Sequence, residues 1–181
     1  MLTLRQIECE LTGISPLLFN KKDNTIDVKL MNPEEIAVRH LHRTESNGRH
    51  PFVPAEMLLR SIRAGGVWVK YKRGTMKKQL DAMLTVEPLE IMIEPAKWVT
   101  DHRIGYNRNG GLPIAIDTYR PRFDVWKLNN IILTWDASLC DDVILRQCCD
   151  SAAYRVGLGS YSPRTGGMFG RYQVTKWKVR K

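Results

Sequence analysis

The glycine-rich loop at residues 157–170 contains the residue types that contact phosphate groups. Five glycines fall within these 14 residues, and Arg155, Arg164 and Arg171 lie in or beside them. Glycine lets the backbone adopt positive φ and approach a ligand, and the guanidinium fork of arginine suits phosphate. We therefore predict a cradle for a polyanion; the same composition also suits a tight turn that leads a helix into the last strand. The predicted contacts are Gly157, Gly159, Ser160, Arg164, Gly166, Gly167, Gly170 and Arg171.

A second basic cluster lies in the middle of the chain. Residues 57–80 contain seven Lys or Arg and no acid, and Trp68 and Tyr71 stand among them. Basic residues interleaved with aromatics suit a strand whose phosphates are neutralised and whose bases stack, which is a sequence-tolerant form of binding. The alternative is a buried Trp68 beside a solvated lysine face. The predicted contacts here are Arg60, Arg63, Lys70, Lys72 and Arg73.

A third candidate region, residues 96–122, connects two expected strands and is rich in Gly, Arg and aromatics. So long a connection is unusual in a compact domain unless it has a function or is disordered. We interpret it as a protruding hairpin that contacts bases or a neighbouring subunit; a hairpin that packs only on itself is the alternative. Its predicted contacts are Arg103, Tyr106, Arg108, Arg120 and Arg122.

The charge of the chain agrees with an anionic partner. Lys and Arg number 28 against 19 Asp and Glu, so the formal net charge is +9, and the pI of about 9.6 exceeds the value near 9 at which nucleic-acid binding is suspected. An anionic membrane is the rival partner, but the sequence has no stretch of 18 apolar residues and no evident basic amphipathic helix. Four cysteines without CxxC spacing indicate reduced, partly buried thiols and a cytoplasmic protein. We predict no cofactor and no metal site.

The elements that would position these residues follow from periodicity and caps. Apolar alternation predicts strands, and Asn32-Pro33 and Pro54 predict helix starts. The expected order is strand 2–13, helix 33–42, helix 54–65, short helix 75–84, strands 86–93 and 123–135, helix 141–155 and strand 172–179. With the helix at 33–42 placed in an insertion, this is the β-α-β-β-α-β pattern of a ferredoxin-like α+β fold.

Three segments resemble the RAMP superfamily of CRISPR-associated proteins. Gly-Gly-Met-Phe-Gly-Arg-Tyr-Gln-Val at 166–174 is similar to the family's signature loop, residues 52–63 to its first-helix motif, and Ile-Ser-Pro-Leu-Leu at 14–18 to the segment after the first strand. The resemblance implies one RRM-like domain over residues 1–181. It also implies an insertion at about 19–50, a thumb at about 96–122, and side-by-side copies on single-stranded RNA. The chain also resembles short phage-encoded proteins. This likeness implies, as an alternative, a RAMP-like protein that acts alone, outside a CRISPR complex.

The resemblance leaves two rival functions open. Some RAMP proteins cleave RNA with an aspartate after the first strand or with a histidine, and Asp23, Asp27, His40, His42 and His50 occupy that region. The other rival is a structural phage protein or a mimic of a Cas subunit. We expect a non-catalytic, oligomerising protein that binds single-stranded nucleic acid. RNA is favoured by the resemblance, although nothing in the sequence reads a 2′-hydroxyl.

Overall fold

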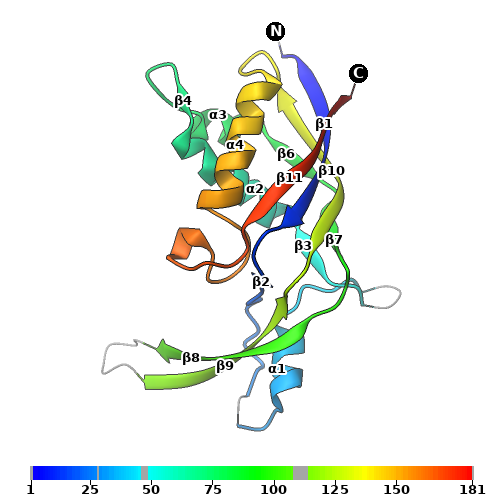
Figure 1. Ribbon diagram of the computed structural model, residues 1–181, viewed down its shortest axis with the longest axis vertical. Helices are drawn as coiled ribbons and strands as arrows, with labels where there is room; N and C mark the ends of the chain where they lie inside the picture. The colour runs from blue at the N-terminus through cyan, green and yellow to red at the C-terminus, as the bar shows by residue number, and fades with distance from the viewer. Residues whose placement is uncertain (1, 28, 46–48, 108–113, 181) are drawn as a thin grey trace.

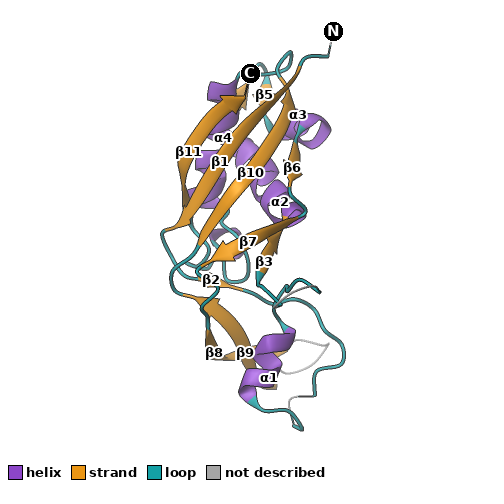
Figure 2. Ribbon diagram, turned by 90° about the vertical axis from the view of Figure 1, so that its right-hand side faces the viewer, coloured by secondary structure: helices purple, strands orange, loops and turns teal. Residues whose placement is uncertain are grey.

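The computed structural model describes residues 2–27, 29–45, 49–107 and 114–180. Its main layer is an antiparallel sheet in the order β11-β1-β10-β7-β3, with β6 also paired to β10. Helices cover one face of this sheet, and the other face is open (Figures 1 and 2). The strands are β1 (Leu4–Gly13), β3 (Phe52–Pro54), β6 (Thr85–Glu87), β7 (Glu90–Glu94), β10 (Lys127–Asp136) and β11 (Tyr172–Arg180).

The connections confirm the predicted ferredoxin-like α+β fold. The chain runs from β1 through α2 (Ala55–Gly65) to β6 and β7, then through β10 and α4 (Asp142–Arg155) to β11. Strand β1 is antiparallel to both β10 and β11, and β10 is antiparallel to β6 and β7. Both crossovers therefore join parallel strands that have one strand between them, which is the split β-α-β arrangement.

The core confirms the strand period that the sequence predicts. On β1, Ile7, Cys9 and Leu11 are buried, and the first two lie opposite Leu133 and Ile131 of β10. Helix α4 begins where the Asp141 carboxylate accepts a hydrogen bond from the Ile144 N–H. Such a cap satisfies a backbone donor that the first helical turn leaves free.

One predicted strand is divided into two. Residues 86–93 were expected to place Leu89, Ile91 and Ile93 on one side, and Ile91 and Ile93 are buried. Leu89 is instead 80% exposed, in the break between β6 and β7. Its carbonyl accepts a hydrogen bond from the N–H of Ala55, the first residue of α2. The chain leaves the strand path there because the two pieces pair with β10 at separate places, so the expectation for Leu89 is wrong.

A smaller unit lies at the lower end of the main sheet (Figure 1). Strands β2 (Leu17–Leu18), β9 (Ile114–Phe123) and β8 (Val99–Asn107) form a second antiparallel sheet, against which α1 (Pro33–Arg39) packs. Helix α1 begins at the Asn32 cap that the sequence predicts, and Asn32 and Glu35 form a capping box there. The remaining elements are η1 (Gly66–Trp68), β4 (Lys70–Tyr71), β5 (Gly74–Thr75), α3 (Lys77–Met83) and η2 (Pro163–Thr165).

The four cysteines are free and buried. Burial raises the pKa of the Cys9 thiol to about 12 and that of Cys140 to about 11, so these thiols stay protonated and unreactive. Within the described ranges, no helix is long and apolar enough to cross a membrane.

Candidate nucleic-acid interface

On the open face of the main sheet, β1 and β11 carry charged side chains that pair with one another. Lys176 Nζ lies 2.7 Å from a Glu8 carboxylate oxygen and 2.9 Å from one of Glu10, and Arg180 lies 3.3 Å from Glu8. An RRM binds RNA by stacking bases on aromatic side chains of its sheet. The side chains named here are charged and compensate one another, so they do not provide such a stacking surface.

The glycine loop uses most of its backbone donors inside the protein. The N–H groups of Gly157, Ser160, Gly166, Gly167 and Gly170 all donate to backbone carbonyls. Ser160 donates to Leu18 O at 2.7 Å and Gly170 to Pro16 O at 2.7 Å, which ties the loop to the segment around β2. These five donors are therefore not free for a phosphate. The predicted backbone cradle does not form at these positions, where contacts to a ligand would have to come from side chains.

Close packing explains the glycines of this loop. Gly170 has a φ of 69°, and a Cβ added there would lie 1.8 Å from Leu158 O. Gly159 has a φ of 70°, and its Cβ would lie 2.4 Å from Leu18 O. A side chain is excluded at both positions by backbone conformation and by space. The loop is thus tightly packed against the rest of the protein. This agrees with the alternative interpretation, a tight turn that leads a helix into the last strand.

The arginines around the loop present their charge outward. Arg155 and Arg164 are exposed, and Arg171 is half-buried with its Nε donating to Tyr154 O at 3.1 Å. Among the described residues, none of the three forms an ion pair with a carboxylate. Their charge is therefore available to an anionic ligand.

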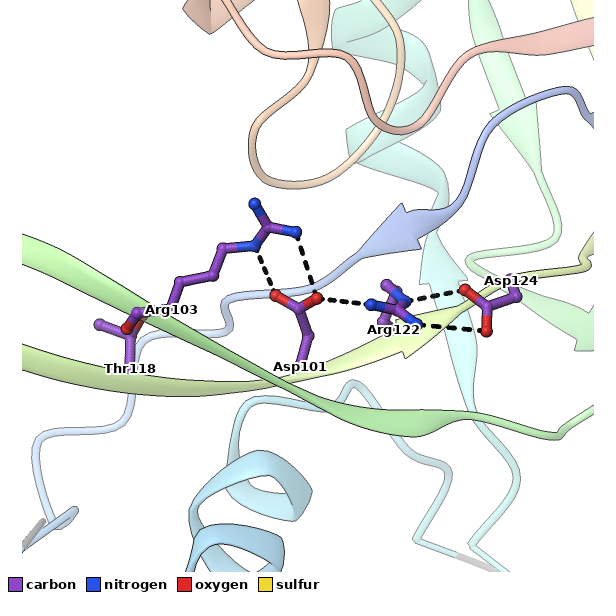
Figure 3. A network of polar contacts seen from close by, with 5 residues as sticks. All are labelled: Asp101, Arg103, Thr118, Arg122 and Asp124. Atoms are coloured by element: carbon purple, nitrogen blue, oxygen red, sulfur yellow. Dashed lines mark hydrogen bonds and ion pairs between the residues drawn. The ribbon is translucent and has the colours of Figure 1, made fainter.

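Two of the predicted arginines in the β8–β9 hairpin are bound to an internal carboxylate instead (Figure 3). Asp101 is only 5% exposed. Its oxygens lie 2.5 Å from Arg103 Nε and 2.7 Å from Arg122 Nη1, and Arg122 Nε also lies 2.7 Å from Asp124. Burial opposes ionisation, but the hydrogen bonds and charges of both arginines outweigh it and hold the pKa of Asp101 below its ordinary value. Arg122 of β9 is thus joined to Asp101 of β8, while Arg103 pairs with the same carboxylate within β8. The charge of both arginines is largely compensated.

We expect Asp101→Asn to lower the free energy of unfolding by about 2–3 kcal/mol near pH 7, because two guanidinium groups would lose their shared carboxylate. The folded pKa lies below that of the unfolded chain, so this stabilisation is complete above about pH 4 and is lost as the pH falls through the folded pKa. Urea denaturation at neutral and acid pH measures both effects.

The control for this variant is Asp117→Asn, which removes an exposed acid of the same hairpin that pairs with His102 at 2.7 Å. Surface pairs contribute about 0–1 kcal/mol, so the control should change stability little. Equal losses in the two variants would contradict a structural role for Asp101.

Aromatic side chains of the glycine loop contact the hairpin. The guanidinium carbon of Arg103 lies 4.7 Å from the ring centre of Phe169, and that of Arg120 lies 5.1 Å from the ring centre of Tyr161. Tyr161 is 37% exposed and has a φ of 50°. Arg120 Nε is buried and has no hydrogen-bond partner in the part of the chain that the structure describes. Of the three predicted hairpin arginines that are described, Arg120 alone is not paired with a carboxylate there.

A pocket of about 280 Å³ lies between α2 and the glycine loop, lined among others by His42, Arg60, Ser162 and Arg164. Arg60 is exposed and pairs at 2.5 Å with Glu56, one turn earlier on α2. Burial lowers the pKa of His42, so its imidazole is neutral at physiological pH. The pocket brings together predicted contacts from the first two candidate regions.

The remaining predicted contacts have different surroundings. Arg63 Nη2 donates to Asp81 O at 3.1 Å and lies 3.9 Å, through Nε, from the Asp81 carboxylate, which connects α2 to α3. Lys70, Lys72 and Arg73 lie on the exposed β4–β5 turn. Figure 1 places the glycine loop between that turn and the β8–β9 hairpin, along one side of the molecule. Arg108 and the side chain of Tyr106 lie outside the described residues.

The acids considered for cleavage have local roles. Asp23 accepts a hydrogen bond from the Thr25 N–H at 2.8 Å and pairs with Arg39 at 3.7 Å. Asp27 accepts from the Lys29 N–H at 2.9 Å. Within the described residues, no group of three or more His, Cys, Asp or Glu side chains is placed to hold a metal ion.

Comparison with known proteins finds similarity in structure and none in sequence. No protein-family profile matches the chain, and no curated protein sequence matches it. The solved structures that resemble it include the crystal structure of Cmr6 from Pyrococcus furiosus, with a TM-score of 0.49 and 12% identity over 96% of this chain and 100% of that chain. The strand order and the two crossovers described above define the fold.

Two aromatic residues beside the predicted contacts were missed by the sequence reasoning. Tyr161 lies within Ser-Tyr-Ser-Pro of the glycine loop, and Tyr154 is 64% exposed, with the Arg171 guanidinium 5.0 Å from its ring centre. Tyr161 could have been predicted as a contact, because it is an aromatic residue inside a glycine-rich loop. Tyr154 has no such signal, because its helix was interpreted only through its apolar stripe.

Proposed function

We propose that this protein is a RAMP-like subunit that binds single-stranded nucleic acid, preferably RNA, without cleaving it and without sequence selection. The strand would lie across the glycine loop on Arg120, Tyr161, Arg164 and Arg171. The observation that carries the proposal is the set of guanidinium groups at this loop with no carboxylate partner among the described residues, interleaved with exposed tyrosines.

The chemistry supports binding to a flexible strand. Each guanidinium can neutralise a phosphate, and each exposed ring can stack on a base regardless of its identity. An RNA duplex presents a shallow minor groove and paired bases, so its bases cannot reach Tyr154 or Tyr161. The preference for RNA over single-stranded DNA depends on the RAMP resemblance of residues 52–63 and 166–174.

Fluorescence anisotropy with labelled oligonucleotides tests the proposal. Oligouridine and oligothymidine of about 20 nucleotides are titrated from low to physiological salt, together with a duplex of the same length. Three to four phosphate contacts predict a slope of log K against log salt of about −2 to −3. Tighter binding to the duplex, or an affinity that salt does not change, would overturn the proposal.

Two further readouts separate the rival functions. Labelled RNA incubated with magnesium should stay intact; cleavage that Asp23→Ala or Asp27→Ala abolishes would favour an endoribonuclease. Size-exclusion chromatography with and without oligonucleotide tests assembly. We expect several copies to gather on a long strand, as in a RAMP filament or Cas-like complex. A defined assembly that ignores nucleic acid would favour a structural phage protein.

A further inference from the structure

Trp68 is an unusual side chain in this protein because it is 58% exposed. It ends η1, directly after α2, and the Arg155 guanidinium carbon lies 4.7 Å from its ring centre. Tryptophan carries a large apolar surface that folding normally buries. An exposed indole covered by a guanidinium group is therefore a candidate contact site, and the alternative interpretation, in which Trp68 is buried in the core, is wrong.

The surroundings of Trp68 are basic and continuous with the glycine loop. Arg155 is the last residue of α4, and its neighbour Tyr154 lies beneath the Arg171 guanidinium. On the other side, the exposed Lys70, Lys72 and Arg73 follow Trp68 in the chain. A basic path thus runs from the end of the loop, over the C-terminal end of α4, to the β4–β5 turn.

The nearby Asp81 carboxylate does not cancel this charge. Lys77 Nζ lies 2.5 Å from it and Arg63 Nε 3.9 Å. Lys77 lies on α3, the helix that carries Asp81, and Arg63 lies on α2, which packs against α3. The charges of Arg155 and of the β4–β5 turn thus have no carboxylate partner among the described residues.

We propose that Trp68 and Arg155 form a second contact site for the same strand. A base stacks on the indole in place of the guanidinium, and the displaced Arg155 pairs with the adjacent phosphate. This proposal rests on the proposed function and extends it. The second contact site lengthens the binding surface. A strand bound at the glycine loop reaches Trp68 only if it extends from Arg171 past Tyr154. Tryptophan is suited to this role because base stacking needs a flat ring and no particular base.

Tryptophan fluorescence measures the contact directly. Of the five tryptophans in the sequence, Trp126 and Trp135 are buried. Wild type and Trp68→Phe are titrated with single-stranded oligonucleotides from about 6 to about 24 nucleotides long. We expect quenching of the wild type to appear only with the longer strands, and Trp68→Phe to lose that quenching while it keeps most of its affinity.

The matched control is Trp177→Phe, which removes another indole covered by an arginine, with the Arg146 guanidinium carbon 5.4 Å from its ring centre. Trp177 is half-buried between β11 and α4, away from the proposed path, so this variant should keep the length-dependent quenching. Trp68→Ala, after its folding has been checked by circular dichroism, should weaken binding of long strands about tenfold and leave short strands unchanged.

The outcomes separate this inference from the function on which it rests. Binding of long strands with unchanged quenching in Trp68→Phe, or equal affinity of Trp68→Ala and wild type for long strands, would overturn the second site and leave the loop site standing. Absence of binding by the wild type would overturn both. Self-association of the protein alone that Trp68→Ala abolishes would assign this surface to a protein contact and also overturn the inference.

Discussion

Replacing both Arg120 and Arg164 with glutamate is expected to weaken binding of single-stranded RNA by about 100-fold near physiological salt. Arg120 lies over Tyr161, and Arg164 lines the pocket between α2 and the glycine loop. Each reversal removes one phosphate contact and places a negative charge beside the strand. The slope of log K against log salt should also become shallower by about 0.7 for each lost contact. Anisotropy titrations across a salt series measure both quantities.

The control for this variant reverses Lys127 and Lys178. Both are exposed and lie on β10 and β11 of the main sheet, so the net charge changes by the same amount. We expect at most a small loss of affinity for the control. If the two double variants lose affinity equally, binding follows the overall charge of the protein and the glycine loop has no special part in it.

The second large effect concerns stability: Gly170→Val should lower the free energy of unfolding by about 3 kcal/mol or more. The substitution forces a β-branched residue to a φ of 69° and places its Cβ 1.8 Å from Leu158 O. Strain of this kind and overpacking each contribute about 1–3 kcal/mol. The Gly170 N–H also bonds to Pro16 O, so the loop would separate from the segment that precedes β2. Urea denaturation gives the loss.

Gly74→Val is the matched control, because a Cβ at Gly74 meets nothing within 4 Å and its turn is exposed. Its effect should stay within about 0.5 kcal/mol, as for most surface substitutions. A Gly170→Val protein with the stability of the control would mean that the loop does not need the packed arrangement described here.

The fold was predictable because its signals are local. Alternation at Ile7, Cys9 and Leu11, the cap at Asn32 and the stop at Gly65-Gly66 each depend on a few neighbouring residues. The break at Leu89 was not predictable, because it depends on where β6 and β7 meet β10. Pairing of that kind is decided by tertiary packing and not by propensity.

The candidate site was harder to predict for a related reason. The sequence shows that the hairpin is rich in arginine. Whether an arginine side chain faces a ligand or a carboxylate depends on the register of the two strands. Asp101 and Arg103 share a face because they are two residues apart on one strand, and Arg122 joins them only through the β8–β9 pairing. Glycines in the loop likewise indicate positive φ but not the partners of their N–H groups.

The most direct test of the binding face is ultraviolet cross-linking of bound oligouridine, followed by mass spectrometry of the linked peptides. We expect links to Tyr161 in the glycine loop and to Tyr154 at the end of α4, both lost when Arg120 and Arg164 are reversed. Links confined to β1 and β11 on the open sheet face, with none in residues 154–171, would contradict the account.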